Sequence, residues 1–428
     1  MRFFLIFFLV FFSFSSSYEV AKFDRSWDRF LYSDVFVMKN KGYINSLNII
    51  YPLGLADEKT NKSGIRYVFF YLLSKQIEDK LSKDRLFCNL RLNVSNDYVQ
   101  IKINVPYNYN LFNVLDSIRN VINNLEYDID KSVLDVLARD VNNYYSQSLN
   151  SILWYFRQNI FSSHPYFFLS YGNPKNFLHF VNKDFDELIA NKKTDYYFLV
   201  ILDEYKDELE VYNYIVNNFR KGRKYKDFYW VSGFSNDKYY YRKVDILKNR
   251  TFSFPVFSES SYFLYLFTAP QFDRNFNEYL AMLVIDNFLA DDLDGVVWKE
   301  LREKKGLIYS VYSDYPLLKY TSYYVIFTSC YYKNQGEVRK IMDKIIENPG
   351  LTDEGIIYSK QKLIDKIKLM FMSTDVLADN LVYSIIYKDK KISPFYLSNY
   401  ISVISTNYIR EIYKKYFGSY YLFIFEGR

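Results

Sequence analysis

One run of the sequence, from Trp298 to Tyr315, reads WKELREKKGLIYSVYSDY. Its pattern predicts a helix that ends at Leu301-Arg302-Glu303, a turn at Gly306 and then a strand that carries Tyr309. The polar residues fall at the helix end and in the turn, and the apolar residues return with a period of two after the glycine. This run therefore predicts a helix followed by a half-buried strand.

Working outward from this run, the same order of elements occurs twice in the chain, which indicates a tandem repeat. The expected elements pair as follows: apolar strands 47–53 and 262–268, helices 64–81 and 278–302, strand pairs 85–94 with 98–105 and 306–313 with 323–331, helices 111–125 and 336–347, helices 129–149 and 353–372, and closing strands from Tyr196 and Tyr420. Leu47 and Tyr262 lie 215 positions apart, and Tyr196 and Tyr420 lie 224 apart. Because the offset is nearly constant, we expect two homologous α+β domains. Each is predicted to have a mostly antiparallel sheet with helices packed on one face.

Length and composition agree with two domains. The chain has 428 residues, 50% of them hydrophobic, which suits two domains of about 200 residues with cores of their own. Aromatic residues make up 21%, and we attribute this excess to nucleotide bias rather than to an aromatic binding platform. The formal net charge of +6 is mild and spread out, so nucleic acid is not expected as a partner.

The N-terminus has the pattern of an export signal. Met1-Arg2 precedes a 12-residue apolar run, Phe3–Phe14, and then Ser15-Ser16-Ser17. The run is short for a membrane span and suits a signal peptide cleaved after Ser17, with an uncleaved anchor as the alternative. We expect residues 1–17 to be this signal and the mature protein to be exported, to the periplasm, without a stable membrane span.

The predicted boundaries place an N-terminal domain at 18–218, a basic linker at 219–255 and a C-terminal domain at 256–428. Ten Lys and Arg residues stand against three Asp between positions 220 and 250. A solvated linker is the simpler interpretation, and a positive rim that attracts an acidic peptide is the alternative. The export compartment permits a disulfide between Cys88 and Cys330, although two free buried thiols are the preferred interpretation.

The run at 298–315 is similar to the C-terminal domain motif of the M16 metallopeptidases, the insulinase or mitochondrial-processing-peptidase-like family. The N-terminal half agrees: Gly54–Glu58 with Lys62–Ile65 resembles the segment before that family's zinc helix, and His164-Pro165-Tyr166 resembles another family segment. The chain looks like a half-size, bacterial-type member. The resemblance implies paired domains of the M16 and LuxS-like metallohydrolase fold.

The zinc ligands of the family are missing from this sequence. Active members carry H-x-x-E-H on a helix, where two histidines bind zinc and the Glu is the general base. By register, Tyr67 and Tyr71 stand in place of the histidines and Phe70 in place of the Glu, and the third ligand would fall near Tyr144-Tyr145. A phenol is a poor zinc ligand. We therefore expect these aromatics to be core residues and the chain to hold no metal and to be inactive by itself.

No other catalytic arrangement takes the place of the zinc site. The sequence has two histidines, His164 and His179, and neither lies in a pattern with the spacing of metal ligands. We expect each of them to be a structural or a surface residue. No nucleophile elbow, P-loop or dinucleotide fingerprint is present. The chain is thus predicted to be a pseudoenzyme.

The resemblance also implies which residues contact substrate. In half-size M16 proteins two chains form a clamshell, one of which brings zinc while the other brings an Arg and a Tyr from its second domain. Here these would be Arg302 and Tyr309. The alternative is that Arg302 pairs with Glu300 or Glu303 and that Tyr309 packs in the sheet. Where the family often has a Gly-rich stretch before this helix, the chain has the more acidic 290–295, ADDLDG.

Three functions compete at this point. The first is a non-catalytic subunit that pairs with a zinc-bearing M16 homologue as a heterodimer and binds peptide or unfolded protein substrate for an exported metalloendopeptidase. The second is a stand-alone peptide-binding or scaffold protein of the core-subunit type. The third is an enzyme with unfamiliar ligands. The first is preferred, with zinc in the partner subunit.

Overall fold

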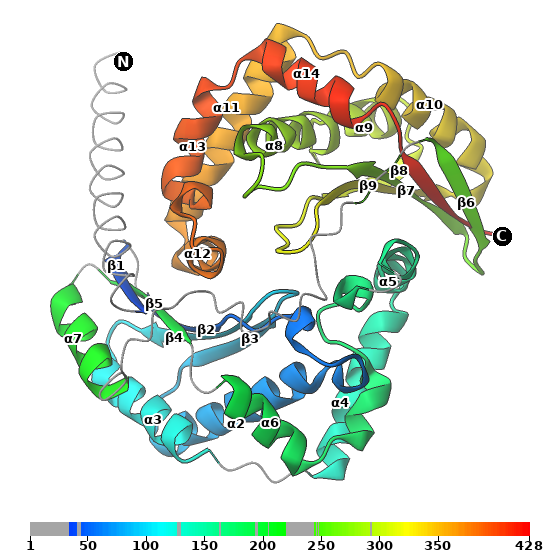
Figure 1. Cartoon of the computed structure of the whole chain (residues 1–428). Coiled ribbons are helices and arrows are strands. Elements are labelled where there is room, and N and C mark those ends of the chain that lie inside the picture. Colours follow the sequence, from blue (N-terminus) through cyan, green and yellow to red (C-terminus); the bar gives the residue numbers. More distant parts are fainter. Residues whose placement is uncertain are drawn as a thin grey trace, which may run out of the picture. The chain divides into compact units, whose positions relative to one another are not determined.

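The computed structural model describes residues 34–40, 44–125, 130–161, 164–192, 196–203, 205–219, 244, 246, 248–291 and 293–428. The predicted signal at 1–17 and most of the predicted linker lie outside these residues. The chain forms two compact units, residues 1–238 with 370–395 and residues 239–369 with 396–428 (Figure 1). The segment Met370–Phe395 therefore belongs to the first unit although it lies late in the sequence.

The first unit contains a five-stranded sheet in the order β1-β5-β2-β4-β3. Its strands are β1 (Val35–Lys39), β2 (Ile44–Tyr51), β3 (Asn89–Val94), β4 (Val99–Pro106) and β5 (Tyr197–Leu202). Only the β1–β5 pair is parallel; the other three pairs are antiparallel. The alternation of apolar and polar residues in β4 sends its apolar side chains, such as Ile101, into the buried cluster of this unit.

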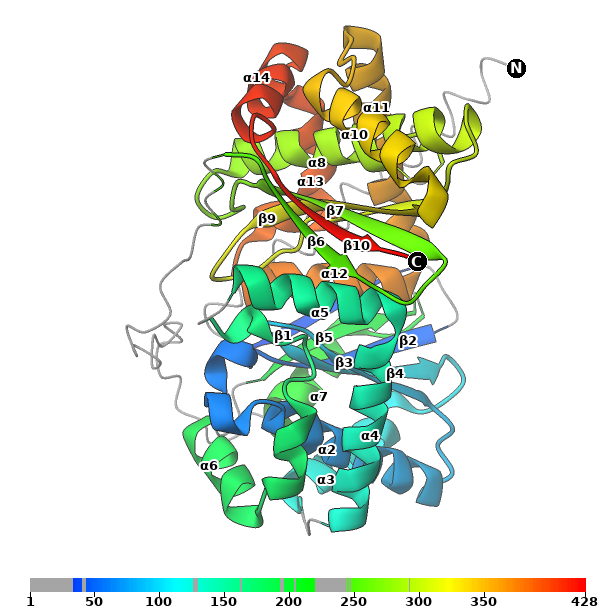
Figure 2. The same cartoon turned by 90° about the vertical axis from the view of Figure 1, so that its right-hand side faces the viewer.

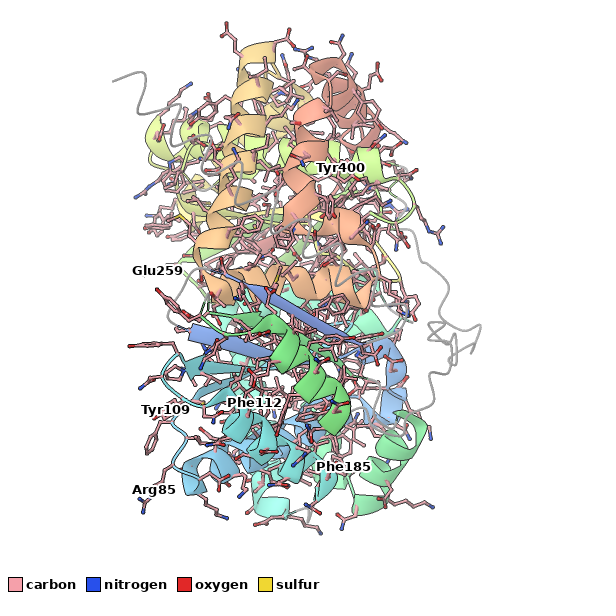
Figure 3. The ribbon with its side chains drawn as sticks, turned by 90° about the vertical axis from the view of Figure 1, so that its left-hand side faces the viewer. Arg85, Tyr109, Phe112, Phe185, Glu259 and Tyr400 are labelled. Carbon is pink, nitrogen blue, oxygen red and sulfur yellow. The ribbon has the colours of Figure 1, made fainter. Side chains whose placement is uncertain are left out.

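Helices pack on this sheet and close its core. They are α2 (Ile65–Lys83), α3 (Leu111–Asn123), α4 (Lys131–Ser146), α5 (Ser148–Ile160), α6 (Asn182–Lys192), α7 (Glu208–Phe219) and α12 (Thr374–Ile386), with short helices η1 (Leu55–Asp57), η2 (Thr60–Lys62), η3 (Pro165–Phe167), η4 (Pro174–His179), η7 (Met370–Met372) and η8 (Lys390–Ile392). In α3, Phe112 packs on Tyr214 of α7 with ring centres 4.7 Å apart. Phe185 of α6 is fully buried beside Phe69 of α2 (Figure 3).

The second unit repeats this plan with the order β6-β10-β7-β9-β8 (Figure 2). Its strands are β6 (Arg250–Pro255), β7 (Ser260–Thr268), β8 (Ile308–Asp314), β9 (Tyr323–Tyr331) and β10 (Tyr421–Glu426). The pair β6–β10 is parallel and the rest are antiparallel. In each sheet, therefore, one edge strand pairs in parallel with the closing strand of its repeat: β1 with β5, and β6 with β10.

The helices of the second unit are α8 (Phe276–Ala290), α9 (Val296–Trp298), the π-helical turn η5 (Lys299–Glu303), α10 (Gln335–Glu347), α11 (Asp353–Leu369), α13 (Pro394–Val403) and α14 (Thr406–Tyr416), with η6 (Tyr332–Asn334). Among them, α8 contacts both α11 and α14. The core helix α8 is apolar around most of its circumference and nearly all buried. The predicted α+β architecture with a tandem repeat is confirmed.

Three elements differ from the sequence-based expectation. The helix expected over 129–149 ends at Ser146, and α5 begins at Ser148. The helix expected over 278–302 is interrupted after Ala290, because Asp291 leaves the helix and Gly295 packs so tightly that a Cβ there would lie 2.6 Å from the Asp291 nitrogen. Residues 250–255, assigned to the linker, form β6. Phe252 and Phe254 of this strand lie against Phe423 and Phe425, so a pattern of alternating aromatics was hidden by the flanking basic residues.

In the described part of the chain no single helix is long and apolar enough to cross a membrane; only the bent pair Asp353–Met372 with Thr374–Ile386 meets the criteria of length and composition together. Both cysteines are free thiols. Burial raises the pKa of Cys88 and of Cys330 to about 11, so neither is a reactive thiolate at neutral pH.

Candidate functional site

The degenerate zinc helix α2 begins at a close approach of two backbones. Gly64 precedes it with φ of 101°, and Gly172 from the loop before η4 also has positive φ, 76°. A Cβ on Gly172 would lie 2.3 Å from the Gly64 nitrogen. Glycine is therefore required at both positions, and this contact fixes where the helix starts.

Next to this start lies a buried ion pair that the sequence analysis missed. Arg66 and Glu58 have side chains only 1% and 2% exposed, with Nε and Oε1 3.8 Å apart. Glu58 accepts hydrogen bonds from the backbone N–H groups of Gly64 and Arg66, at 3.0 and 2.9 Å. The Arg66 guanidinium donates to four carbonyl oxygens, those of Leu53, Ser95, Tyr98 and Ser170, at 2.7–3.2 Å.

These bonds tie together the loop before the helix, the β3–β4 turn and the loop after η3. Burial by itself raises the pKa of Glu58 and lowers that of Arg66, and the mutual charge and the backbone bonds oppose it. The sequence signal was a charged residue, Arg66, at the head of an otherwise apolar helix. Such a residue points to a buried partner, but its identity depends on long-range contacts.

The three degenerate positions are packed among aromatic rings. Phe70 is 1% exposed, and its ring centre lies 4.4 Å from that of Tyr51. Tyr67 and Tyr71 are half-buried on the same helix with ring centres 6.3 Å apart. Burial raises the pKa of Tyr67 to about 12, which keeps its phenol neutral at physiological pH.

The region of the expected third ligand, around Tyr144 and Tyr145, lies beside the tyrosines of α2. Tyr171 lies with its ring centre 4.9 Å from Tyr67 and 5.1 Å from Tyr144 of α4. Tyr145, beside Tyr144, donates its hydroxyl to the carbonyl oxygen of Gly172 at 2.7 Å. The structure thus brings Tyr67 and Tyr144 into contact with Tyr171, with Tyr71 beside Tyr67 and Tyr145 beside Tyr144.

This cluster does not fit zinc. The predicted positions hold phenols and one phenyl ring, which has no donor atom, where zinc requires imidazole, thiolate or carboxylate. Over the described ranges, no group of three or more His, Cys, Asp or Glu residues is placed to hold a metal ion. His164 is buried and its Nδ1 accepts from the Tyr166 backbone N–H at 3.2 Å, whereas His179 is exposed. One histidine is therefore structural and the other lies on the surface.

In the second unit, Arg302 and Tyr309 lie beside each other. Arg302 sits in the π-helical turn η5, followed by Gly306 with φ of 64° and by β8. Its Nη1 donates to the carbonyl oxygen of Ile308 at 3.0 Å, and its guanidinium carbon lies 6.0 Å from the centre of the Tyr309 ring. A π-helical turn is frequent at functional sites, and here it points Arg302 toward the strand that follows.

Both side chains of this pair are exposed, and the Tyr309 side chain is 68% exposed. Within the described residues Arg302 forms no ion pair with Glu300 or Glu303, the alternative partners; Glu300 pairs instead with Lys304 at 2.6 Å. Tyr309 does not pack in the core of the sheet either. The pair offers a permanently charged donor fork and a phenol hydroxyl to a ligand at the edge strand β8.

The acidic stretch before this turn is neutralised from within its own unit. Asp291 accepts from Lys362 at 2.7 Å and also from Lys366, and Asp294 accepts from Lys362 at 2.6 Å. These bonds, with the turn bonds to Leu293 and Asp294 N–H, hold the pKa of Asp291 well below its usual range despite burial. The Asp291 and Asp294 carboxylates are thus engaged by lysines of α11.

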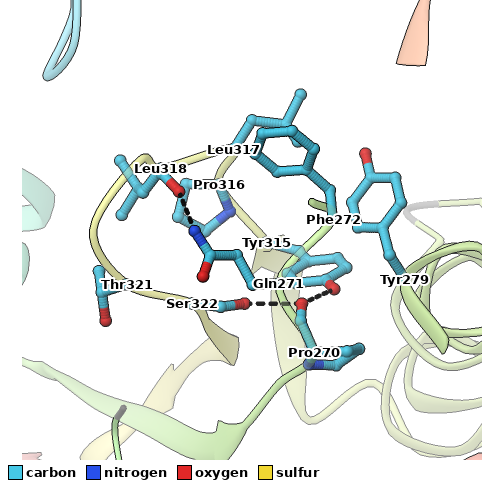
Figure 4. Close-up of a pocket in the computed structure, with 10 residues that line it drawn as sticks. All are labelled: Pro270, Gln271, Phe272, Tyr279, Tyr315, Pro316, Leu317, Leu318, Thr321 and Ser322. Atoms are coloured by element: carbon cyan, nitrogen blue, oxygen red, sulfur yellow. Dashed lines mark hydrogen bonds between the residues drawn. The ribbon is translucent and has the colours of Figure 1, made fainter. Parts of the chain in front are cut away.

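A shallow pocket in the same unit has about 160 Å³ of empty space, open solvent included, and essentially no room for a water-sized molecule, far short of a typical ligand site. Its walls are the loops before α8 and between β8 and β9 (Figure 4). Tyr315 and Ser322 both donate to the carbonyl oxygen of Pro270, and Gln271 donates to those of Leu318 and Lys319. These bonds fasten two loops to each other, which gives the pocket a structural role.

Comparison with known proteins bears on both halves of the chain. The family model "Peptidase M16 inactive domain" matches residues 206–363. A protease from Helicobacter pylori has a similar structure, with a TM-score of 0.75 and 13% identity over 92% of this chain and 96% of that one. A chain of complex III2 from Candida albicans has a TM-score of 0.68 and 11% identity over 92% and 93%.

The periplasmic protease PqqL from Escherichia coli also shares the fold, with a TM-score of 0.65 and 12% identity; the match covers 92% of this chain and 44% of PqqL. No curated protein matches the sequence. The matched family model includes the run at 298–315 from which the resemblance was predicted. The predicted resemblance is confirmed for the part of the chain that the family model covers: residues 206–363 match the inactive domain of the M16 peptidases, and the chain shares its fold with the proteases from Helicobacter pylori and Escherichia coli.

Proposed function

We propose that this chain is the non-catalytic subunit of an exported zinc endopeptidase, in which a separate M16 homologue carries H-x-x-E-H and holds the zinc. The matched family domain is the inactive one, and Tyr67, Phe70 and Tyr71 stand at the ligand positions. Both facts support a non-catalytic member of the family. The partner, the heterodimer and the periplasmic location are parts of the proposal, and the periplasmic protease among the similar structures is in keeping with the last.

The observation that carries the proposal is the exposed pair Arg302–Tyr309. A guanidinium presents several N–H donors in one plane to a peptide carbonyl or carboxylate. A tyrosine hydroxyl could donate to the oxyanion that would develop on the peptide carbonyl during hydrolysis, while the partner's zinc would supply the Lewis-acid chemistry. In the proposed assembly the chain therefore binds the peptide and stabilises the transition state, and the partner supplies the metal and the general base.

A second function is favoured by one comparison. Because a complex III2 chain shares this fold, a non-enzymatic scaffold or stand-alone peptide-binding role is the alternative. In that role the tyrosine cluster around Tyr171 and the Arg66–Glu58 pair serve stability alone, and no zinc-bearing homologue is needed.

The test is to purify the tagged mature chain from its native cells and identify stoichiometric partners by mass spectrometry. A single H-x-x-E-H homologue at one-to-one, with zinc and peptidase activity in the purified pair, is the expected result. A homo-oligomer, or a large assembly without such a homologue, would overturn the proposal in favour of the scaffold role. Zinc or activity in the isolated chain would overturn both.

A further inference from the structure

The segment Met370–Phe395 is fastened to the first unit, far from its neighbours in the sequence. Its helix α12 packs on strands β2 and β5, on the side of the sheet opposite α2 and α3 (Figure 1). The chain leaves the second unit after Leu369 and returns to it at Tyr396. The segment therefore lies across the first unit as a strap held at both ends.

The sheet face beneath this strap is polar. In β4 the residues Gln100, Lys102 and Asn104 alternate with the apolar residues of the core. Gln100 accepts from Asn93 at 3.2 Å and donates to Asn48 at 2.9 Å, and Asn48 donates to the carbonyl oxygen of Leu199 at 3.0 Å. Asn93, Gln100, Asn48 and the Leu199 carbonyl thus form a ladder of hydrogen bonds within the sheet, whereas Lys102 and Asn104 bond to α12.

Such a face is unusual under a helix. A sheet face that stays covered is normally apolar, whereas a polar face is typical of one that meets water. Gln100 and Asn48 are nevertheless 0% exposed. Because the ladder bonds run between strands, they persist whether or not α12 covers them, so uncovering this face leaves no broken hydrogen bonds among these residues.

Charges hold the strap onto this face. Lys102, 4% exposed, lies 3.0 Å from Asp375 and 2.6 Å from Asp379, one helical turn apart on α12. Arg91 of the edge strand β3 lies 3.2 Å from Asp375, and Asn104 donates to Asp375 at 3.0 Å. The two carboxylates are 32% and 45% exposed, so water and salt ions reach the acidic side of this cluster.

Hydrogen bonds outside the charge cluster hold both ends of the strap as well. Asn40 donates to the carbonyl oxygen of Phe371 at 3.1 Å, and Tyr387 donates to Asp97 at 2.8 Å. The apolar side chains of Leu377 and Leu381 on α12 are buried. The structure thus holds the strap closed through polar, ionic and apolar contacts together.

We propose that Met370–Phe395 is a releasable strap, in which the Lys102, Asp375 and Asp379 cluster is the lock that lets α12 leave the polar sheet face while the rest of the first unit stays folded. The open form is a minor population that uncovers Lys102 and the polar ladder. The proposal is independent of a peptidase partner, since it rests on contacts within the first unit.

Hydrogen–deuterium exchange of the full chain, followed by mass spectrometry at increasing NaCl, tests the strap. Because the lock is partly exposed to ions, we expect the amides of α12 to exchange about tenfold faster at high salt, while those of α2 and β5 keep their rates. Equal salt dependence of α12, α2 and β5 would overturn the proposal, because α12 would then open only with the whole unit.

Variants of Lys102 and Asp379 provide a second test of the strap by the same exchange measurement. Lys102→Ala should speed exchange in α12 at least tenfold, and Asp379→Asn, which leaves Asp375 in place, should do so by a smaller factor. The matched control is Lys75→Ala, which removes the exposed Lys75–Glu78 pair on α2 and should leave α12 unchanged. If Lys102→Ala fails to fold, the Asp379→Asn variant and the salt series of the unmodified chain still decide the question.

Discussion

The helix α2 and the run at 298–309 are the two places where the M16 motif is recognisable, and they have diverged in opposite ways. In α2 the ligand positions hold buried or half-buried aromatic rings around Tyr171. At 298–309 the guanidinium of Arg302 and the phenol of Tyr309 remain exposed. Metal binding requires several residues to converge, so it is lost when any of them changes, whereas a two-residue contact surface can persist without it.

The difference also separates what stabilises the fold from what meets a ligand. The buried Arg66–Glu58 pair organises the start of α2 and faces no solvent. Arg302 donates one hydrogen bond, to the carbonyl oxygen of Ile308, and forms no ion pair within the described residues. Four predictions, ordered by the size of their expected effect, test whether stability and ligand contact depend on separate regions of the chain.

The largest effect is expected from Arg66→Met. The substitution leaves the Glu58 carboxylate buried without its cation and four carbonyl oxygens without a donor, so it should lower the free energy of unfolding by about 3–5 kcal/mol. Urea unfolding followed by circular dichroism measures this. The control is Arg139→Met, which removes an exposed pair with Asp135 and should change little. A stability loss no larger than that of the control would contradict a structural role for the buried pair.

Arg302→Ala should have the next largest effect, and on turnover rather than stability. If Arg302 contacts the peptide, the assembled complex should form normally and lose about 10²-fold in turnover. Steady-state peptidase assays of the purified pair measure this, with Lys304→Ala as the neighbouring exposed control. Unchanged turnover in Arg302→Ala would remove the proposed substrate contact and would leave the two regions functionally alike.

Asp291→Asn tests the neutralised stretch before the π-helical turn. Because lysines hold the pKa of Asp291 low, its ionised form stabilises the fold above the ordinary aspartate pKa of about 4, and this contribution is lost as the pH falls further. The substitution should cost about 1–3 kcal/mol at neutral pH.

Stability curves for both proteins from pH 7 downward provide the measurement. The gap between the parent and Asp291→Asn should narrow below about pH 4, because Asp291 then binds a proton in the unfolded parent while the folded parent still holds it ionised. A gap that is independent of pH would show that the lysine pairs do not stabilise this loop.

The sequence predicted the fold well because its evidence is local and repeated. Alternation in β4 and the helical period of α3 and α10 are each visible in single segments, and the nearly constant offset between the halves shows the repeat. The missing zinc ligands were equally readable, since a motif with fixed spacing shows its losses position by position.

Long-range contacts could not be predicted in the same way. The partner of Arg66 lies before the helix and its carbonyl acceptors lie in three separate loops. The alternation in β4 indicated that the sheet has one covered face and one face open to solvent. Nothing in residues 370–395 indicated that α12 covers the polar face. The break at Asp291 depends on the lysines of α11, about 70 positions later in the chain.

The smallest effect is expected from deleting one phenol oxygen, and the same deletion can be made in both regions. Tyr309→Phe keeps the ring beside Arg302 and removes only a donor to the reacting carbonyl, so turnover of the complex should fall by up to about tenfold. Tyr67→Phe removes a phenol that stays neutral in a packed cluster, so turnover should not change. Both variants should unfold at the parent's urea midpoint, which separates a lost contact from a damaged fold. If the two variants lose turnover equally, the aromatic cluster of α2 also faces the substrate. The proposed contrast between this packed cluster and the exposed Arg302–Tyr309 pair would then be wrong.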